Sequence, residues 1–147
     1  MDLDQTLVVA GIGCRAGVTA EQVEAALAAA LAAIEHPAAP RQALLPKLTL
    51  SLIATPVSKA RESAIAAAAA ARGVPVTLIA QSALEAANPR TVTHSDHSLS
   101  AMNVRSVAEA AALAGAGTNS QLLGPRIVVG PVTCALARAQ SEGTHSL

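Results

Sequence analysis

The sequence predicts an α/β fold, a three-layer sandwich with helices on both faces of a mainly parallel, mixed sheet of about five strands. Short apolar runs alternate along the chain with longer segments in which apolar residues recur every three or four positions, giving the order strand, helix, strand, helix, strand. Apolar residues make up 52% of the chain, but Phe, Tyr and Trp are absent. The core is therefore expected to consist of Leu, Ile, Val and Ala. A chain of 147 residues is expected to form a single domain over 1–147.

The first strand and the first helix have clear signals. An unbroken apolar run over 6–10 is typical of a strand buried on both faces, and a loop with three glycines is expected over 11–17. Thr19 and Gln22 have the spacing of a capping box, which begins a helix. That helix is expected to end before Pro37. Its apolar stripe consists of Val23, Leu27, Leu31 and Ile34.

Two more strands are expected in the middle of the chain. Leucines alternate with polar residues over 48–54, and a second apolar run covers 74–79. A helix is expected between these strands, beginning at Thr55 or Ser58 and ending at Arg72. In this order each helix is the crossover connection between two neighbouring strands, which are therefore expected to be parallel.

The last third of the chain predicts two helices and two strands. A short helix is expected over 82–87. A second capping box over 106–109 begins a helix that ends at Gly115 or Gly117. Two strands separated by Gly130 and Pro131 are expected to add an antiparallel edge to the sheet.

Composition and charge exclude several classes of protein. Ten basic and ten acidic residues give a net charge of zero, which excludes a strong polyanion binder, and without aromatic residues no base can be stacked, so no nucleic-acid partner is expected. The longest apolar runs, 25–34 and 64–71, are shorter than the roughly 18 residues of a membrane span. The acidic start of the chain is unlike a leader, so a cytoplasmic protein is expected. Two cysteines are too few for a disulfide framework and are expected to be reduced.

The glycine motif is the strongest candidate for a binding site. Gly11, Gly13 and Gly17 lie between the first strand and the first helix, with Arg15 among them. Glycines let a ligand approach main-chain amides, and a helix start and a guanidinium both favour an anion. The alternative is a tight turn that binds nothing. The spacing G-x-G-x-x-x-G differs from the dinucleotide motif, which makes a nucleotide less favoured than another anion.

Other residues allow more than one interpretation. Cys14 stands beside Arg15 near a helix start, where a thiol can become a nucleophile, but without an evident partner base a small apolar filler is the favoured interpretation. Lys59 follows the second strand and is expected on the same edge as Arg15. The capping box alone explains Ser106 and Glu109. Arg126 and Thr133, which flank the last turn, are expected to be surface or capping residues.

A polar segment over 90–101 is expected to be a loop. It contains His94 and His97 with Asp96 between them, residue types that ligate zinc when geometry brings them together. A solvated loop explains them without a metal, and no metal site is predicted.

Three segments together match the pattern of a known family. They are Val-Ala-Gly-Ile-Gly-Cys-Arg-Ala-Gly over 9–17, Ser-Val-Ala-Glu-Ala-Ala-Ala-Leu over 106–113, and Pro125-Arg126 followed by 132–138. In these segments the chain resembles the cobalamin biosynthesis family CobE and the C-terminal domain of CbiG, the cobalt-precorrin-5A hydrolase. The resemblance covers nearly the whole chain in the right order.

The resemblance also implies a set of site residues. This chain departs from the family pattern at Ala16, where the family often has a second basic residue, and over 56–58, where an acidic residue commonly precedes the lysine. It departs again over 127–129, which is more apolar than is usual. Cys14 is the candidate catalytic residue. The implied ligand-binding residues are Gly11, Gly13, Cys14, Arg15, Gly17, Lys59, Ser106 and Glu109, with Glu62 in the same pattern as Lys59.

The resemblance implies a role in building the corrin ring, and three hypotheses follow. In the first, the protein binds a precorrin or hydrogenobyrinic-type intermediate without a cofactor, and hands it to other enzymes of the cobalamin pathway. In the second, it hydrolyses a corrin-ring lactone with Cys14 or a bound water as nucleophile. The third is a small module that binds a nucleotide or phosphate. Corrin intermediates are apolar macrocycles fringed with carboxylates, which suits an edge bearing Arg15 and Lys59.

Overall fold

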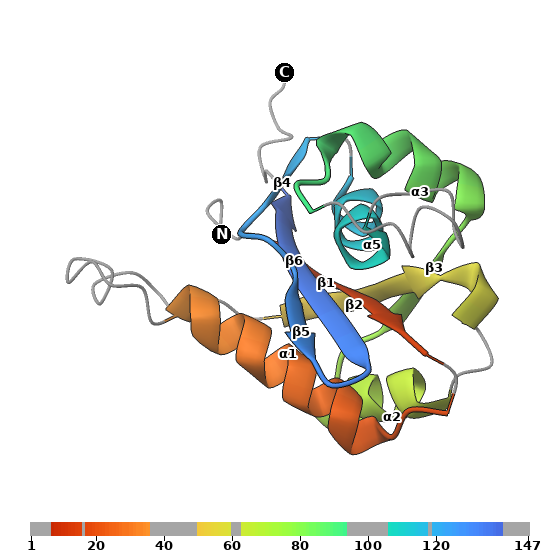
Figure 1. Ribbon diagram of the computed structural model, residues 1–147, viewed down its shortest axis with the longest axis vertical. Helices are drawn as coiled ribbons and strands as arrows, with labels where there is room; N and C mark the ends of the chain where they lie inside the picture. The colour runs from red at the N-terminus through yellow and green to blue at the C-terminus, as the bar shows by residue number, and fades with distance from the viewer. Residues whose placement is uncertain are drawn as a thin grey trace.

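The computed structural model describes residues 7–15, 17–35, 50–59, 63–93, 106–117 and 119–139. These residues form an α/β sandwich in which strands and helices alternate over most of the chain (Figure 1). In chain order the elements are β1 (Leu7–Cys14), α1 (Ala20–Glu35), β2 (Leu50–Pro56), the 3-10 turn η2 (Val57–Lys59), α2 (Ser63–Arg72), β3 (Val76–Ile79), α3 (Gln81–Ala87), the 3-10 turn η3 (Asn88–Arg90), α5 (Val107–Ala116), β4 (Ser120–Leu122), β5 (Ile127–Val129) and β6 (Val132–Ala139).

The six strands form one mixed sheet in the order β3-β2-β1-β6-β4, with β5 also paired to β6. Strands β1, β2 and β3 are parallel, whereas β6 is antiparallel to β1, β4 and β5. The predicted α/β fold with a mixed sheet is confirmed. The last two predicted strands extend the sheet in antiparallel fashion, as expected: β6 pairs with β1 along its whole length and lies between β1 and β4, and β5 pairs with β6. Its apolar run from Cys134 to Ala137 is buried, as expected for a strand covered on both faces.

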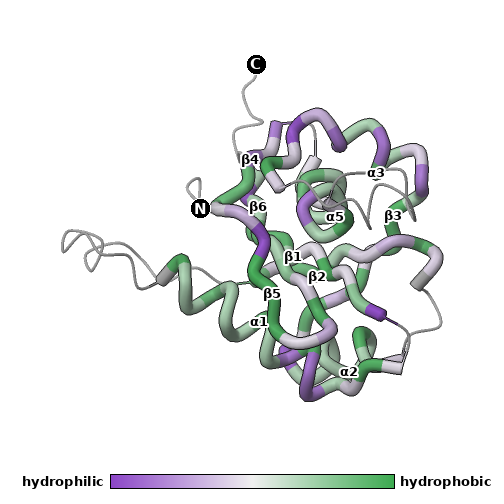
Figure 2. Tube along the Cα trace, in the orientation of Figure 1, coloured by the Kyte–Doolittle hydropathy of each residue, from purple (hydrophilic) through white to green (hydrophobic). Residues whose placement is uncertain are grey.

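Helices cover both faces of the sheet (Figure 1). Side chains of β1 alternate between the faces: Val8 and Ile12 pack in a core with α1 and α2, whereas Val9 packs in a second core with α3 and α5. In Figure 2 the central strands are mostly green, and α3 on the outside carries clear purple stretches. None of the described helices is long and apolar enough to cross a lipid bilayer.

The start of α1 and its buried stripe are confirmed. The Thr19 amide donates to Gln22 Oε1 at 2.9 Å, and the Gln22 amide donates to Thr19 Oγ1 at 3.1 Å, which is the reciprocal pair of a capping box. Val23 and Leu27 are fully buried in the core that α1 shares with α2. The helix is described as far as Glu35, in agreement with an end before proline.

Small residues let α5 lie directly on the sheet. A Cβ atom added to Gly11 would overlap the Ala108 carbonyl oxygen and lie 2.5 Å from the Ala112 amide nitrogen. A Cβ on Gly115 of the helix would lie 2.8 Å from the Ala54 Cβ in β2. Glycine and alanine on both surfaces therefore allow the short distance between α5 and the sheet. This close packing of backbones fills the core without aromatic side chains.

Several boundaries differ from those predicted. β1 continues to Cys14 instead of ending at residue 10, because β6 pairs with it as far as Val132. A 3-10 turn follows β2, and α2 begins only at Ser63. The three-residue strand β4 was not predicted, since its sequence Ser-Gln-Leu has no strand pattern and only pairing with β6 makes it a strand.

Candidate functional site

The glycine motif lies mostly inside β1, which corrects the expected loop over 11–17. Gly11 and Gly13 belong to the strand, and of the three glycines of the motif only Gly17 has a positive φ, of 86°. Gly11 makes room for the α5 backbone, as described above. These two strand glycines are thus explained by helix packing, and neither presents its amide in a phosphate-binding loop.

Arg15 and Lys59 follow neighbouring parallel strands at their carboxyl ends, as predicted. Arg15 comes directly after β1 and is exposed, and Lys59 is the last residue of the turn that follows β2. Near the ends of these strands, the buried Thr55 Oγ1 donates to the Ile12 carbonyl at 2.9 Å and ties the two together. Glu62 lies outside the described residues.

The first turn of α5 meets the ends of β1 and β6 at this edge. A Cβ on Gly13 would lie 3.7 Å from the Val107 Cβ and 2.8 Å from Thr133 Oγ1. Thr133 Oγ1 donates to the Gly13 carbonyl at 3.2 Å. Ser106 caps the helix, because its Oγ accepts from the Glu109 amide at 3.4 Å. The partial positive charge of a helix start therefore lies beside the carboxyl end of β1.

Glu109 makes hydrogen bonds beyond those of the predicted capping box, so the expectation that capping alone explains it is wrong. Its side chain is fully buried. Glu109 Oε1 accepts from the backbone amides of Val92 and Thr93, both at 2.8 Å. Glu109 Oε2 accepts from Thr93 Oγ1 at 2.6 Å and from the Arg126 amide at 3.0 Å. One carboxylate thus joins α5 to two segments that are far apart in the sequence.

We call this group the carboxyl edge: Gly13, Arg15, Val92, Thr93, Ser106, Val107, Glu109, Arg126 and Thr133. The sequence interpretation missed Val92 and Thr93, and it took Arg126 and Thr133 for isolated surface residues. The available signal was the last family segment, which contains Arg126 and Thr133. No local sequence pattern marks the bonds to Glu109, because their donors lie 16 or 17 residues away along the chain.

Cys14 is not brought together with the α5 start. Its side chain packs against the core on the α1 and α2 face, whereas Val107 approaches the neighbouring Gly13 from the other face. Cys14 is partly exposed, Cys134 is buried on the same face, and neither cysteine forms a disulfide in the described structure. Burial raises the pKa of the Cys134 thiol to about 12, an effect that the positive charge of Arg72 opposes only in part. Cys134 therefore remains a neutral thiol at physiological pH.

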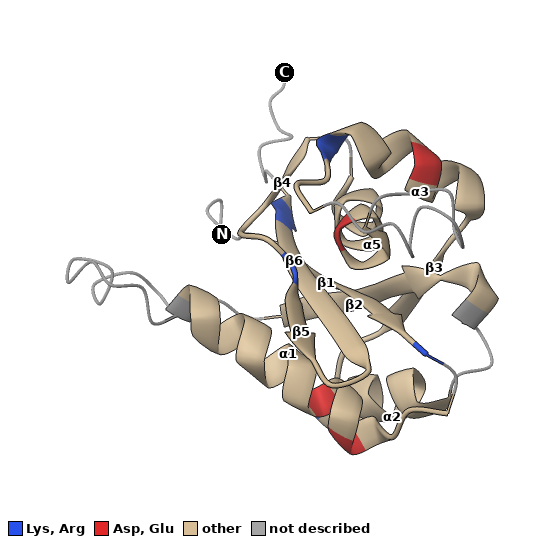
Figure 3. Cartoon of the chain, viewed as in Figure 1, with Lys and Arg blue, Asp and Glu red and all other residues tan. Residues whose placement is uncertain are grey.

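His94, Asp96 and His97 lie outside the described residues. In the part of the chain that the structure describes, no three His, Cys, Asp or Glu side chains gather as metal ligands do. Charged residues are sparse on the described helices and strands and are scattered over them (Figure 3).

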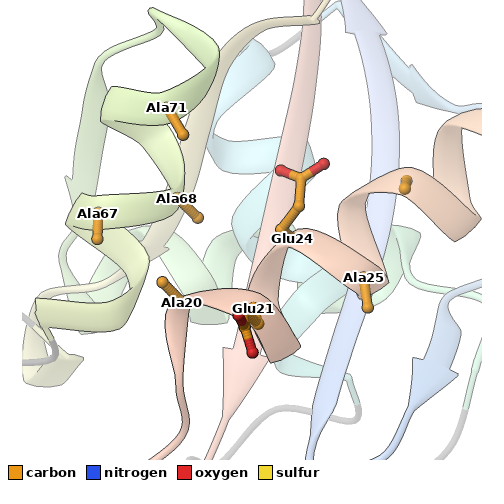
Figure 4. A pocket seen from close by; sticks show the side chains of 8 residues that line it. Ala20, Glu21, Glu24, Ala25, Ala67, Ala68 and Ala71 are labelled. Atoms are coloured by element: carbon orange, nitrogen blue, oxygen red, sulfur yellow. The ribbon is translucent and has the colours of Figure 1, made fainter.

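Two hollows have linings that contain no residue of the carboxyl edge. A groove of about 470 Å³ runs between α1 and α2 and is lined by alanines with Glu21 and Glu24 (Figure 4). A cavity of about 220 Å³ lies between α1 and the β5–β6 hairpin, and Cys134 is among its lining residues. Neither hollow is lined by a residue of the predicted site.

Residues 8–137 match the family model described as Cobalamin synthesis G C-terminus. The chain belongs to this family. It is 35% identical over 130 residues to Protein CobE of a Sinorhizobium species, an alignment that covers 88% of this chain and 79% of that protein. The family resemblance noted from the sequence is thereby confirmed.

Solved structures agree with this membership. The fold is similar to that of CobE, a protein from the cobalamin (vitamin B12) biosynthetic pathway, with a TM-score of 0.76 at 34% identity over 90% of both chains. It is also similar to cobalamin biosynthesis protein chiG from Agrobacterium tumefaciens, with a TM-score of 0.68 at 39% identity over 90% of this chain and 98% of that one. A putative cobalamin biosynthesis protein G homolog from Sulfolobus solfataricus, 18% identical, shares the fold over 37% of its length with a TM-score of 0.56.

This member of the CobE and CbiG C-terminal family is therefore a cobalamin biosynthesis protein. All three sequence segments that carried the resemblance contribute residues to the carboxyl edge: 9–17 through Gly13 and Arg15, 106–113 through the α5 start, and the last segment through Arg126 and Thr133.

Proposed function

We propose that this protein binds a corrin-ring intermediate of cobalamin biosynthesis, a precorrin or a hydrogenobyrinic-type compound, at the carboxyl edge. The observation that carries the proposal is the convergence there of a helix start, an exposed arginine and uncovered apolar side chains. Binding serves to protect the intermediate or to transfer it to the next enzyme of the pathway.

The chemistry of the edge matches that of the ligand. Arg15 offers a planar fork of N–H donors, and the α5 start adds partial positive charge; both suit the carboxylates around the ring. Lys59 ends the turn that follows β2, the strand next to β1, and is proposed as a second cation. Val57 and Val92 are 52% and 58% exposed, and burying them under the ring would remove apolar surface from water.

Binding without turnover is favoured over lactone hydrolysis. A nucleophile must lie within reach of the bound substrate and of groups that stabilise the developing charge. The Cys14 side chain is on the sheet face that α1 and α2 cover, whereas the start of α5 lies on the opposite face. A nucleotide module is disfavoured because Gly11 and Gly13 are strand residues.

Absorption spectroscopy tests the proposal, since a chain without Tyr or Trp leaves the bands of the macrocycle undisturbed. Titration of hydrogenobyrinic acid with the protein should shift those bands, and gel filtration should recover ligand and protein together. Arg15→Ala should weaken binding about tenfold, as expected for a lost charge-assisted bond. Arg138→Ala is the matched control, because Arg138 pairs with Val8 at the amino end of β1.

Three results would count against the proposal. Failure of precorrin and hydrogenobyrinic-type compounds to bind would remove it. Release of acetaldehyde from cobalt-precorrin-5A by the isolated protein would make the protein a hydrolase. Tight binding of a nucleotide in place of a corrinoid would favour the small anion-binding module.

A further inference from the structure

We propose that Glu109 is a positioning residue that holds Val92 and Arg126 in place for the ligand: Val92 packs on the face of the macrocycle, and Arg126 binds one of its carboxylates. This inference rests on the proposed function and names two contact residues in addition to Arg15. It also changes the role of Glu109 from a direct ligand contact to a residue that acts through the backbone it binds.

The Glu109 carboxylate has no free capacity for a ligand. A carboxylate offers about four lone-pair sites, and four donors of the protein occupy them. The side chain is also completely buried. Burying a carboxylate costs free energy unless its acceptor sites are hydrogen-bonded. Here all four donors belong to two segments that are distant from each other in the sequence. Its evident effect is to fix those segments against α5.

Val92 is the proposed contact residue of the first of these two segments. Its backbone amide is held by Glu109 Oε1, and its neighbour Thr93 is held by both its amide and its hydroxyl. The Val92 side chain is nevertheless 58% exposed. An apolar side chain on a fixed backbone, uncovered in the described structure, can bury its surface on a ligand without the entropic cost of ordering a loop.

Arg126 is the corresponding residue of the second segment. Glu109 Oε2 holds its amide, which places the residue beside the first turn of α5. Its side chain is half-buried, and no ion pair or hydrogen bond of its guanidinium is found among the described residues. A guanidinium is always charged, and its geometry fits a carboxylate in a bidentate manner. Glu109 thus holds an apolar residue and a cation beside the same helix turn, as a carboxylate-fringed macrocycle requires.

Hydrogen exchange tests the positioning role in the absence of ligand. In Glu109→Gln, both acceptor atoms lose the negative charge and one of them becomes an NH2 group, so the amides of Val92, Thr93 and Arg126 should exchange at least tenfold faster. Amides of β1 and α1 should keep their rates. Thr93→Val removes a single donor from the carboxylate and provides a milder variant if Glu109→Gln does not fold. Unchanged exchange at the three amides in a folded variant would overturn the positioning role.

Ligand selectivity tests the functional part. The probes are hydrogenobyrinic acid and the same macrocycle with its carboxylates converted to primary amides. Arg126→Ala should reduce the preference for the acid, measured as the ratio of its affinity to that of the amide, about tenfold, and Arg126→Lys should restore part of this preference. Val92→Ser should weaken the binding of both probes equally. Glu109→Gln should reduce the preference in the same direction as Arg126→Ala, and the double variant should lose less than the sum of the two effects.

A structural control separates positioning from general destabilisation. Ser120 Oγ donates to the carbonyls of Leu113 and Gly117 at the far end of α5, so Ser120→Ala loosens the same helix. It should lower stability without changing the preference for the acid. If Glu109→Gln behaves like Ser120→Ala in selectivity, the ligand role of Glu109 is wrong. If the wild type binds neither probe, the proposed function fails, and hydrogen exchange still decides whether Glu109 holds the two segments.

Discussion

Gly11 in β1 and Ala108 in α5 are in contact through their backbones: the Ala108 carbonyl oxygen occupies the space into which a Cβ of residue 11 would project. The second glycine of the strand, Gly13, likewise lies against Val107 and Thr133. The family motif around these glycines is therefore first a packing motif. It brings the start of α5 to the end of β1 and so creates the carboxyl edge.

Gly11→Ala should destabilise the fold strongly. None of the three backbone atoms that a Cβ would meet can move without shifting α5 from the sheet, so we expect a loss of about 1–3 kcal/mol in the free energy of unfolding. Urea denaturation measures it. Gly124→Ala is the matched control, because a Cβ there meets nothing within 4 Å, and it should be close to neutral. Equal stability of the two variants would show that α5 does not lie this close to β1.

The capping box of α1 should contribute measurably to stability. Thr19→Ala removes the acceptor of the Gln22 amide and should lower the free energy of unfolding by about 1 kcal/mol. Thr19→Ser keeps that acceptor and should recover most of the loss. Thermal unfolding of the three proteins provides the comparison, and a Thr19→Ser variant as unstable as Thr19→Ala would contradict the role of the hydroxyl.

Stability should fall at alkaline pH because of Cys134. Its pKa is raised from 9.0 to about 12 in the folded state, chiefly by burial. Above pH 9 the unfolded chain loses the thiol proton while the folded chain keeps it. The stabilisation is therefore complete below pH 9 and declines as the pH rises toward 12, with a slope of up to about 1.4 kcal/mol per pH unit.

Denaturation curves between about pH 8 and 11, the range in which the thiol of the unfolded chain titrates, measure this slope. The chain has no tyrosine and only two lysines, so few other groups titrate there. Cys134→Ala should be less stable at neutral pH, because the cavity costs free energy, but its pH slope should be flatter. A slope that is the same in both proteins would assign the alkaline loss to another group.

The ion pair between α1 and α2 should contribute little. Arg72 binds the Glu24 carboxylate through two nitrogens, Nε at 2.9 Å and an Nη at 2.6 Å, but the side chains are 28% and 42% exposed. We expect a coupling energy below about 1 kcal/mol, reduced further by salt. A double-mutant cycle with Glu24→Gln and Arg72→Gln, run at low and high salt, measures it. A coupling that salt leaves unchanged would mean that the pair is shielded from solvent.

Local patterns in the sequence predicted the elements whose signals are themselves local. The capping boxes located the starts of α1 and α5, and the apolar stripe of α1 correctly identified Val23 and Leu27 as core residues. The parallel order of the first three strands followed from their alternation with helices. Arg15 and Lys59 could be assigned to one edge because parallel strands end on the same side of a sheet.

The remaining features depend on contacts that no local pattern encodes. Gly11 and Gly13 resemble loop residues in the sequence, because the need for glycine comes from α5, which is far away along the chain. Glu109 resembles a capping residue for the same reason: its position suits a capping box, and only the fold shows that its partners are Val92, Thr93 and Arg126. The inner position of β6 likewise depends on pairing and not on composition.

The pairing of β1 with β6 has a consequence for biosynthesis. Leu7 is opposite Ala139, so the two strands at the centre of the sheet come from opposite ends of the described chain. On the ribosome, β1 and β2 are synthesised early, but the edge of β1 that β6 covers stays open until translation reaches residue 139. Such an open, apolar strand edge is prone to aggregation, and closing so long a loop slows folding. We therefore expect this domain to fold only after its last strand leaves the ribosome, and we expect chaperones that shield strand edges to assist the nascent chain.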